Sequence, residues 1–325
     1  MLISTNKKTR KTLFSYICTL TVFLSISFTF QNKSLPVIGI LSNPETGSDK
    51  NSTLYRVNAN YVRWLEANGM EAIAIHPWLS DTQLSSVLPK LNGILLQGES
   101  FDFDKESDYY KTASSIIQKA KNFLTTPVYN FPVFGVCSGF QVLQTVLAET
   151  DVLTVHPHQD TASSLIFDFD EIKDSKMFFD INDYLAKVLN STKSIYEYHF
   201  MAVGPEQYSE KNKLRDFMNY NTLDKDSKGN FYVASAEGIK NYPFFGVQFH
   251  PEMVSFNRNK ARNVPESFES VQVSKHFGHF LLKQALQNKN QYESARENDN
   301  YLTSKLPATA DKDGNYYYNF EKPKA

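Results

Sequence analysis

The sequence contains little cysteine, with Cys18 and Cys137 as its two cysteines in 325 residues, which excludes a disulfide framework. It also lacks a charge imbalance, because 34 basic residues are set against 35 acidic ones. Without bulk basicity, neither nucleic acid nor an anionic membrane is expected as a partner. Internal repeats and low-complexity segments are missing too. The hydrophobic content of 41% instead indicates a globular protein with a sizeable core.

The N-terminus differs in kind from the rest of the chain. Four basic residues between positions 7 and 11 precede an uncharged apolar stretch at 13–30. This layout predicts a signal peptide over residues 1–30, with a retained membrane anchor as the alternative. Sequons of the form N-x-S/T follow at Asn32, Asn51 and Asn190, as expected of a glycoprotein that is secreted or resides in a lysosomal or vacuolar lumen. No membrane contact is expected after signal cleavage.

Buried strands and amphipathic helices alternate through the first half of the chain. Apolar runs predict strands at 36–41, 72–75, 93–96 and 132–136. Helical periodicity predicts helices at 57–67, 81–87, 109–123 and 139–147. We expect Asp81 to cap the second of these helices. Continuous apolar strands between helices are typical of a parallel sheet that is covered on both faces, so this half is expected to be α/β.

The second half of the chain gives a weaker pattern. From about Val152 onward the pattern loosens, and an acidic, turn-rich stretch lies around 168–174. Strands are expected again at 217–222, 231–236 and 244–249, followed by a closing helix at 268–287. We expect residues 31–325 to form a single domain whose polar tail, after about residue 288, lies on the surface. An edge strand at 316–320 is the alternative for that tail.

Cys137 lies in the segment G-V-C-S-G at 135–139, between a predicted strand and a predicted helix. This G-x-C-x-G pattern is the cysteine version of the strand-turn-helix nucleophile elbow. The glycines leave room around a nucleophile whose backbone is strained. The dipole and free amides of a helix N-terminus also stabilise a thiolate. The pattern therefore predicts a catalytic nucleophile, whereas an isolated cysteine would as readily be a buried, inert thiol.

A second motif, G-V-Q-F-H-P-E at 246–252, ends a predicted strand at His250. Because the carboxyl ends of parallel strands meet at one edge of the sheet, His250 is expected near Cys137. There it would accept the thiol proton and later protonate the leaving amine. Glu252 would orient the imidazole as the third member of a triad. The backbone amides of Ser138 and Gly98 are expected to bind the developing oxyanion.

These motifs resemble the gamma-glutamyl hydrolase family of the class I glutamine amidotransferase-like superfamily. The likeness rests on the Cys137 elbow, on G-V-Q-F-H-P-E, and on the segments 36–41, 60–69 and 91–96. The segment 197–200 is similar to the part of the family that carries its second important histidine. The resemblance implies a flavodoxin-like, mostly parallel sheet flanked by helices. It also implies that His199 lines the substrate cleft and assists turnover.

The resemblance further implies cysteine-dependent hydrolysis of gamma-glutamyl bonds in folate and antifolate polyglutamates, through a thioester and without metal or cofactor. Poly-gamma-glutamylated folate would be the small-molecule partner, with a homodimer left open, and Tyr61 would shape the pocket. The sequence leaves two alternative hypotheses open. One is a glutaminase or another gamma-glutamyl conjugate hydrolase, and the other is a non-catalytic secreted or membrane-anchored binding protein. The pairs His156/His158 and His276/His279 lack the further ligands that a zinc site needs.

The segment after the third predicted strand departs from the family pattern. The family usually has Pro-Gly-Gly there, whereas this chain has Gln97-Gly98-Glu99. Gly98 retains the expected oxyanion amide. Glu99 adds a carboxylate beside a cleft that is expected to receive polyanionic tails, unless its side chain points outward.

Overall fold

The apolar strands of the sequence pair into a main sheet in the order β4-β1-β5-β6-β11-β10-β9. Its members are β1 (Val37–Leu41), β4 (Glu71–Ile75), β5 (Gly93–Leu96), β6 (Val133–Val136), β9 (Met218–Lys225), β10 (Phe231–Gly238) and β11 (Phe244–Val247). The strands from β4 to β11 are parallel, and β10 and β9 extend the sheet in antiparallel fashion. The predicted α/β fold with a mostly parallel sheet is confirmed.

This computed structural model describes residues 34–45, 52–99, 104–123, 130–209, 211–257, 259–290 and 302–324. The predicted signal segment, Cys18 and the sequons at Asn32 and Asn51 lie outside the described residues. The chain from Pro36 onward forms one compact unit. Within the described ranges, no helix has the length and apolar character needed to cross a membrane.

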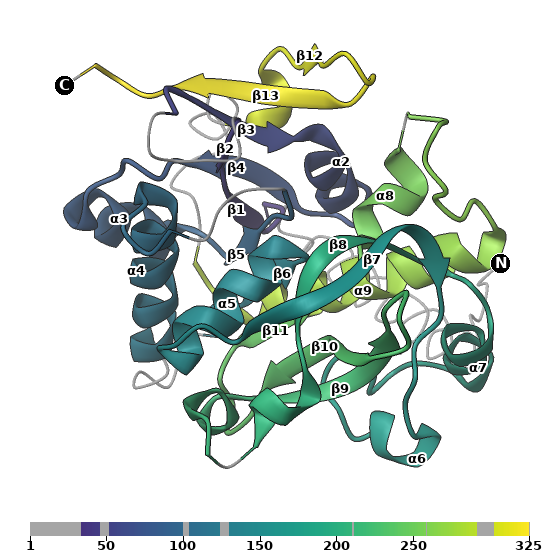
Figure 1. Ribbon diagram of the computed structural model, residues 1–325. Helices are drawn as coiled ribbons and strands as arrows, with labels where there is room; N and C mark the ends of the chain where they lie inside the picture. Colours follow the sequence, from purple (N-terminus) through teal and green to yellow (C-terminus); the bar gives the residue numbers. More distant parts are fainter. Residues whose placement is uncertain are drawn as a thin grey trace, which may run out of the picture. The chain divides into compact units, whose positions relative to one another are not determined.

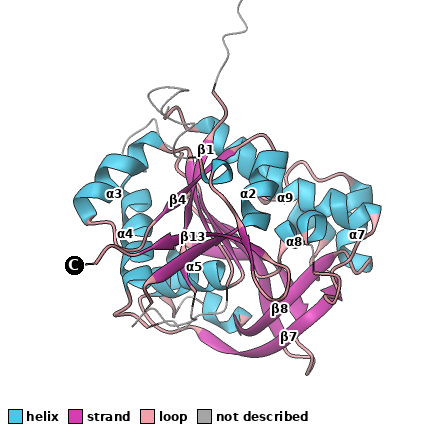
Figure 2. Ribbon diagram, turned by 90° about the horizontal axis from the view of Figure 1, so that it is seen from above, coloured by secondary structure: helices cyan, strands magenta, loops and turns pink. Residues whose placement is uncertain are grey.

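Helices cover both faces of the main sheet (Figures 1 and 2). The helices on one face are α2 (Ala59–Ala67) and α9 (Phe268–Gln287). Those on the other are α3 (Asp81–Val87), α4 (Asp108–Phe123) and α5 (Ser138–Ala148). The first core is rich in aromatic rings, with Trp64 of α2 and Phe280 of α9 both packed against Phe134 of β6. Burial on both sides explains why the central strands read as unbroken apolar runs.

The remaining described helices are short. They are α6 (Phe169–Ile172), α7 (Asp183–Ser191), α8 (Pro251–Phe256) and the 3₁₀ turns Leu88–Lys90, Pro205–Tyr208, Lys213–Asp216 and Thr303–Lys305. The expectation that Asp81 caps α3 was wrong. Ser80 is the cap, because its hydroxyl accepts a hydrogen bond from the Gln83 amide while the Gln83 side chain accepts one from the Ser80 amide.

The stretch after Val152 is more regular than its sequence predicts. It contains β7 (Leu153–Ser163) and β8 (Ile195–Val203), which pair in antiparallel fashion with two shifts in register. The loose sequence pattern did not predict either strand. Polar residues and Pro157 interrupt the alternation of β7, and its buried histidines face polar partners, so the usual apolar periodicity of a strand is missing.

A second sheet brings the C-terminal tail back to an early strand. Its order is β12-β13-β3-β2, formed by β2 (Asn43–Pro44), β3 (Leu54–Asn58), β12 (Thr309–Ala310) and β13 (Tyr316–Glu321). β13 runs antiparallel to β3, with Tyr318 opposite Val57 (Figure 1). The predicted helix at 57–67 therefore begins two residues later, at Ala59. The tail forms the alternative strand, although it pairs outside the main sheet.

Candidate active site

Cys137 stands between β6 and α5 in a backbone conformation that is uncommon for a residue with a side chain, with φ 51° and ψ −116°. The two glycines near it are required because neighbouring atoms leave no room for a side chain. A Cβ on Gly135 would lie 2.6 Å from Cα of Phe140, and a Cβ on Gly139 would lie 2.0 Å from the carbonyl oxygen of Leu96. These approaches fix the elbow between β5, β6 and α5. The cysteine is a free thiol that is 6% exposed.

His250 follows β11, the strand that neighbours β6, so the sheet places it at the same edge as Cys137. Its Nδ1 lies 2.8 Å from Oε1 of Glu252. Burial by itself lowers the pKa of His250, but the Glu252 carboxylate and the sulfur of Cys137 raise that pKa well above its usual value. A charged imidazolium held between a carboxylate and a sulfur is the arrangement that stabilises a thiolate.

Gly98 follows β5 and lies against the same group of residues. A Cβ at this position would lie 2.8 Å from Cβ of Cys137, 2.9 Å from the hydroxyl of Tyr61 and 3.0 Å from Cε1 of His250. Only glycine fits here without displacing a neighbour. The Gly98 amide donates a hydrogen bond to the Tyr61 hydroxyl at 2.9 Å. Burial and the Glu252 carboxylate raise the pKa of Tyr61 well above its usual value, so the hydroxyl stays protonated.

Glu99 lines the pocket instead of pointing away from it. Its carboxylate pairs with Arg56 of β3 at 3.1 Å, and its amide donates to the hydroxyl of Ser138 at 2.8 Å. The buried Gln97 accepts a hydrogen bond from the Asn58 amide at 3.0 Å and donates one to the Arg56 carbonyl at 2.8 Å. The departure from Pro-Gly-Gly therefore ties the end of β5 to β3, and it gives the Glu99 carboxylate a partner of opposite charge.

His199 borders the pocket, yet its side chain on β8 is only 1% exposed. Its Nε2 lies 3.2 Å from Oε2 of Glu197, and its ring packs edge-on against Tyr232 with 4.8 Å between ring centroids. Burial lowers the pKa of His199 to about 3 and raises the pKa of Glu197 to about 7. His199 is therefore neutral at ordinary pH, which suits it to a hydrogen-bonding role more than to a charged one.

A buried polar cluster continues from His199 beneath the β7–β8 pair. Nδ1 of His158 lies 3.0 Å from the hydroxyl of Tyr232, which donates to Oδ2 of Asp224 at 3.1 Å. His156 pairs separately with Asp226 at 3.2 Å. No group of three or more histidine, cysteine or acidic side chains suited to a metal ion occurs in the described part of the chain. The cluster explains why β7 carries polar residues on a buried face.

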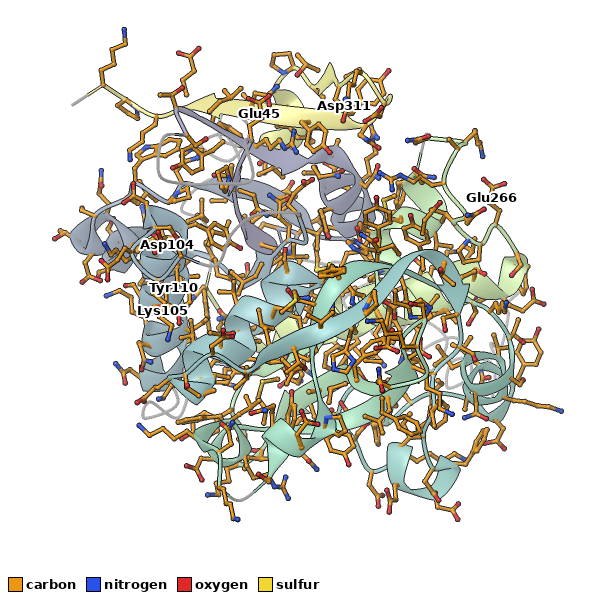
Figure 3. All side chains as sticks on the ribbon, in the orientation of Figure 1. Glu45, Asp104, Lys105, Tyr110, Glu266 and Asp311 are labelled. Atoms are coloured by element: carbon orange, nitrogen blue, oxygen red, sulfur yellow. The ribbon has the colours of Figure 1, made fainter. Side chains whose placement is uncertain are left out.

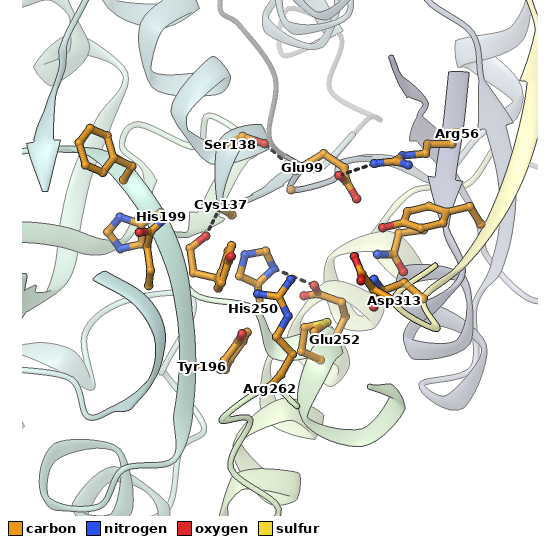
Figure 4. A pocket seen from close by; sticks show the side chains of 18 of the residues that line it. Arg56, Glu99, Cys137, Ser138, Tyr196, His199, His250, Glu252, Arg262 and Asp313 are labelled. Atoms are coloured by element: carbon orange, nitrogen blue, oxygen red, sulfur yellow. Dashed lines mark hydrogen bonds and ion pairs between the residues drawn. The ribbon is translucent and has the colours of Figure 1, made fainter. Parts of the chain in front are cut away.

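A pocket of about 530 Å³ is lined by Gly98, Glu99, Cys137, Ser138, His199, His250 and Glu252 among others (Figure 4). The sequence did not point to several of its lining residues: Arg56, Tyr196, Tyr198, Arg262, Asp311 and Tyr317. The alternation of L-Y-R-V-N at 54–58 was a usable strand signal for Arg56. Arg262 lies in an irregular loop without such a signal. Asp311 comes from the tail, next to β12 (Figure 3), and only the pairing of β13 with β3 brings this segment to the pocket.

Asn190 is the predicted sequon that lies within the described residues. It is half-buried near the end of α7, and its Nδ2 donates a hydrogen bond to the Leu165 carbonyl at 3.2 Å. One N–H of the amide remains for a glycan.

A cysteine elbow and a histidine at the carboxyl edge of a parallel sheet define a class of enzymes that attack acyl groups with a thiolate. Residues 56–263 match the glutamine amidotransferase class-I family, and the chain belongs to that family. It is similar to the gamma-glutamyl hydrolase of Rattus norvegicus, with 29% identity over 81% of each chain.

Two further relatives carry the same description. Gamma-glutamyl hydrolase 1 of Arabidopsis thaliana is 28% identical over 89% of this chain and 84% of its own length. The gamma-glutamyl hydrolase of Homo sapiens is 28% identical over 82% of this chain and 83% of its own length. The resemblance predicted from the motifs is confirmed.

Proposed function

We propose that this chain hydrolyses gamma-glutamyl bonds with Cys137 as its nucleophile, and that its substrates are the poly-gamma-glutamate tails of folates and antifolates. The observation that carries the proposal is the convergence of Cys137, Gly98 and His250, whose contacts leave no room for one added methyl group. The names of the similar proteins supply the bond type. A pocket of about 530 Å³ falls within the range of pockets for small-molecule ligands.

In the first half of the reaction, the thiolate of Cys137 attacks the gamma-carbonyl carbon. The carbonyl oxygen takes up the negative charge and accepts hydrogen bonds from the amides of Ser138 and Gly98. The carbon–nitrogen bond then breaks, and the leaving amine takes a proton from His250. The product of this half is a thioester between Cys137 and the gamma-glutamyl group.

In the second half, water attacks the thioester while His250 accepts its proton. The carbon–sulfur bond breaks, the gamma-carboxylate leaves and the thiolate is restored. Glu252 keeps the imidazole oriented through both halves, because its oxygen stays 2.8 Å from Nδ1. The buried, neutral His199 is suited to a hydrogen-bonding role at the pocket wall.

Tyr61 has a specific part in this scheme. Its hydroxyl oxygen accepts the hydrogen bond of the Gly98 amide, the same amide that the oxyanion requires. Substrate binding therefore has to exchange the tyrosine oxygen for the carbonyl oxygen, or share the amide between them. Either way the donor is already oriented before substrate arrives, which lowers the reorganisation that the transition state needs.

The test compares the wild type with Cys137→Ala on pteroyl pentaglutamate, gamma-glutamylanilide and glutamine. The wild type is expected to shorten the polyglutamate tail, and the variant is expected to lose at least 10³-fold of that activity, roughly the size of a lost nucleophile. A variant that keeps its activity contradicts the role of Cys137. Rapid labelling of Cys137 by iodoacetamide in the wild type is the accompanying measurement of thiolate character.

A glutaminase is the second candidate, and the match to the class-I amidotransferase family favours it. Glutamine and a gamma-glutamyl isopeptide present the same acyl group to the thiolate. The two candidates separate in the same assay. Ammonia from glutamine together with an untouched polyglutamate tail supports the glutaminase, whereas inertness towards all three substrates supports a non-catalytic binding protein.

We also propose that the enzyme works in a secreted, lysosomal or vacuolar lumen. The support is the signal-like sequence of residues 1–30 and the three sequons. Expression in a eukaryotic host, followed by N-terminal sequencing and glycosidase treatment of the secreted protein, tests this. Protein retained in the membrane fraction with residues 1–30 intact contradicts cleavage.

A further inference from the structure

Arg56 and Arg262 both line the pocket, but their charges are in different situations. Arg56 pairs with Glu99 at 3.1 Å and lies over the ring of Tyr317, with Cζ 4.2 Å from the ring centroid. Its charge is therefore already neutralised. Arg262 lies over the ring of Tyr198, also at 4.2 Å. Within the described ranges, no carboxylate lies at ion-pair distance from the Arg262 guanidinium.

The loop that carries Arg262 is held in place by its neighbours. The Asn263 amide donates to Oδ1 of Asp160 at 2.9 Å, and Val264 is buried against Tyr196. Both oxygens of Asp160 are occupied, Oδ1 also by the Tyr196 hydroxyl at 2.8 Å and Oδ2 by the Asn263 side chain at 3.0 Å. Asp160 therefore supports the loop and attracts Arg262 from beyond ion-pair distance, without forming an ion pair with it. The guanidinium is positioned before any ligand binds.

Arg262 lies on the side of the pocket that receives the leaving group in the proposed reaction. The ring of Tyr196 connects the two sites, because it lies 6.2 Å from the ring of His250 and 6.4 Å from the ring of Tyr198. Figure 4 shows Arg262 beside Tyr196 and His250, with Arg56 and Glu99 across the pocket. His250 protonates the leaving amine in that reaction, which brings a leaving glutamate to the side of the pocket that His250 and Arg262 share.

We propose that Arg262 is a specificity residue that binds a carboxylate of the glutamate on the leaving side of the scissile bond. The inference rests on the proposed function. The guanidinium lies over the Tyr198 ring and also interacts with the Tyr198 hydroxyl. Its other donors match a carboxylate with two parallel hydrogen bonds. Because Arg56 is already paired with Glu99, Arg262 is the arginine of the pocket that can bind an anion.

The experiment uses two substrates with the same acyl group, gamma-glutamyl-glutamate and gamma-glutamylanilide, since the anilide has no carboxylate on the leaving side. Arg262→Gln is expected to raise KM for gamma-glutamyl-glutamate roughly 10- to 100-fold, as for a lost charge-assisted hydrogen bond. Its kcat on that substrate, and both constants on the anilide, are expected to change less than about two-fold. Arg262→Lys is expected to recover part of the loss, because the charge remains without the planar fork.

Lys260→Gln is the matched control. It removes a positive charge from the same loop, but Lys260 is exposed and paired with Glu266 outside the residues that line the pocket. It should leave both substrates unaffected. Equal losses on the two substrates in Arg262→Gln, or no loss on either, overturn the assignment of Arg262. A wild type that cleaves neither substrate defeats the proposed function itself, so the two failures are distinguishable.

Discussion

The pocket has two regions that are built in different ways. The catalytic floor, meaning Gly98, Cys137, Ser138 and His250, follows the ends of β5, β6 and β11, where a Cβ added to Gly98 would lie within about 3 Å of Cys137 and His250. The rim, meaning Arg56, Glu99, Arg262, Asp311 and Tyr317, comes from β3, the segment after β5, a loop and the tail. Steric fit holds the floor together, whereas ion pairs and cation–π contacts hold the rim.

This difference separates two properties of the enzyme. A change on the floor meets atoms that cannot move, so it should affect the chemical step. A change on the rim alters charges that are partly hydrated and screened, so it should affect which substrate binds and how strongly salt weakens the binding. Substitutions in each region test whether the separation holds.

After the loss of the Cys137 thiol itself, the largest effect is expected from Gly98→Ala on the floor. The new methyl group would meet Cys137, Tyr61 and His250 at 2.8–3.0 Å, which displaces the nucleophile or the oxyanion donor. We expect kcat/KM on a polyglutamate to fall by about 10²-fold or more. Gly229→Ala is the control for backbone strain away from the pocket, because its φ of +86° disfavours a side chain while nothing lies within 4 Å of the added Cβ. If Gly98→Ala keeps its activity, steric fit does not hold the floor together and the contrast with the rim is wrong.

Glu252→Gln should have the next largest effect. Glu252 raises the pKa of His250, so its neutralisation should lower that pKa and shift the histidine-dependent limb of the pH–rate profile towards lower pH. Loss of the orienting carboxylate should also reduce kcat by about 10²-fold. Profiles of kcat/KM against pH for both proteins provide the measurement. An unshifted limb would mean that Glu252 does not set the charge of His250.

Glu99→Gln on the rim should act on binding alone. The substitution removes a negative charge from the pocket and releases Arg56 from its 3.1 Å ion pair. We expect KM for pteroyl pentaglutamate to fall by about 3-fold at low salt, with kcat unchanged, and the gain to shrink as salt rises. A change in kcat instead of KM would show that the segment after β5 couples the rim to the floor.

The smallest effect on activity is expected from Glu197→Gln, because Glu197 lies behind the pocket. This substitution should instead alter how the stability of the fold depends on pH. Burial raises the pKa of Glu197 to about 7, above the value of about 4.3 expected when unfolded. The folded state thus binds more protons between these values, and its stability falls as pH rises through that window. His199, whose pKa is lowered to about 3, has the opposite effect. Below pH 6.5 it makes the stability of the folded state rise as pH rises.

Thermal melts at pH 5 and pH 7.5 test this prediction. The glutamine variant cannot ionise, so its melting temperature should rise relative to the wild type between the two pH values. Folded His199, with a pKa of about 3, is neutral at both pH values. Its slope therefore comes from the unfolded histidine, which is the same in both proteins. Parallel changes in the two proteins would contradict a buried, proton-binding Glu197.

The chemistry of the floor could be predicted from the sequence because it depends on local patterns. The elbow at 135–139 needs glycine next to its nucleophile, and the strands before Cys137 and His250 are continuous apolar runs. Parallel strands place their carboxyl ends at one edge, so two motifs 113 residues apart could be assigned to one site. The closing helix at 268–287 was predicted with its observed bounds, and the structure shows Ser267 as its N-cap.

The tertiary structure alone decided the rim. Buried polar residues in β7 remove the apolar alternation that would predict a strand. The tail reaches the pocket only because β13 pairs with β3, more than 250 residues earlier. Whether Arg56 or Arg262 carries an available charge depends on the position of Glu99, which no local pattern encodes. The sequence by itself thus determined the positions of the proposed nucleophile and its proposed base, through backbone requirements that act over a few residues. Long-range pairing decided which charges surround them, because charge neutralisation depends on distances in space.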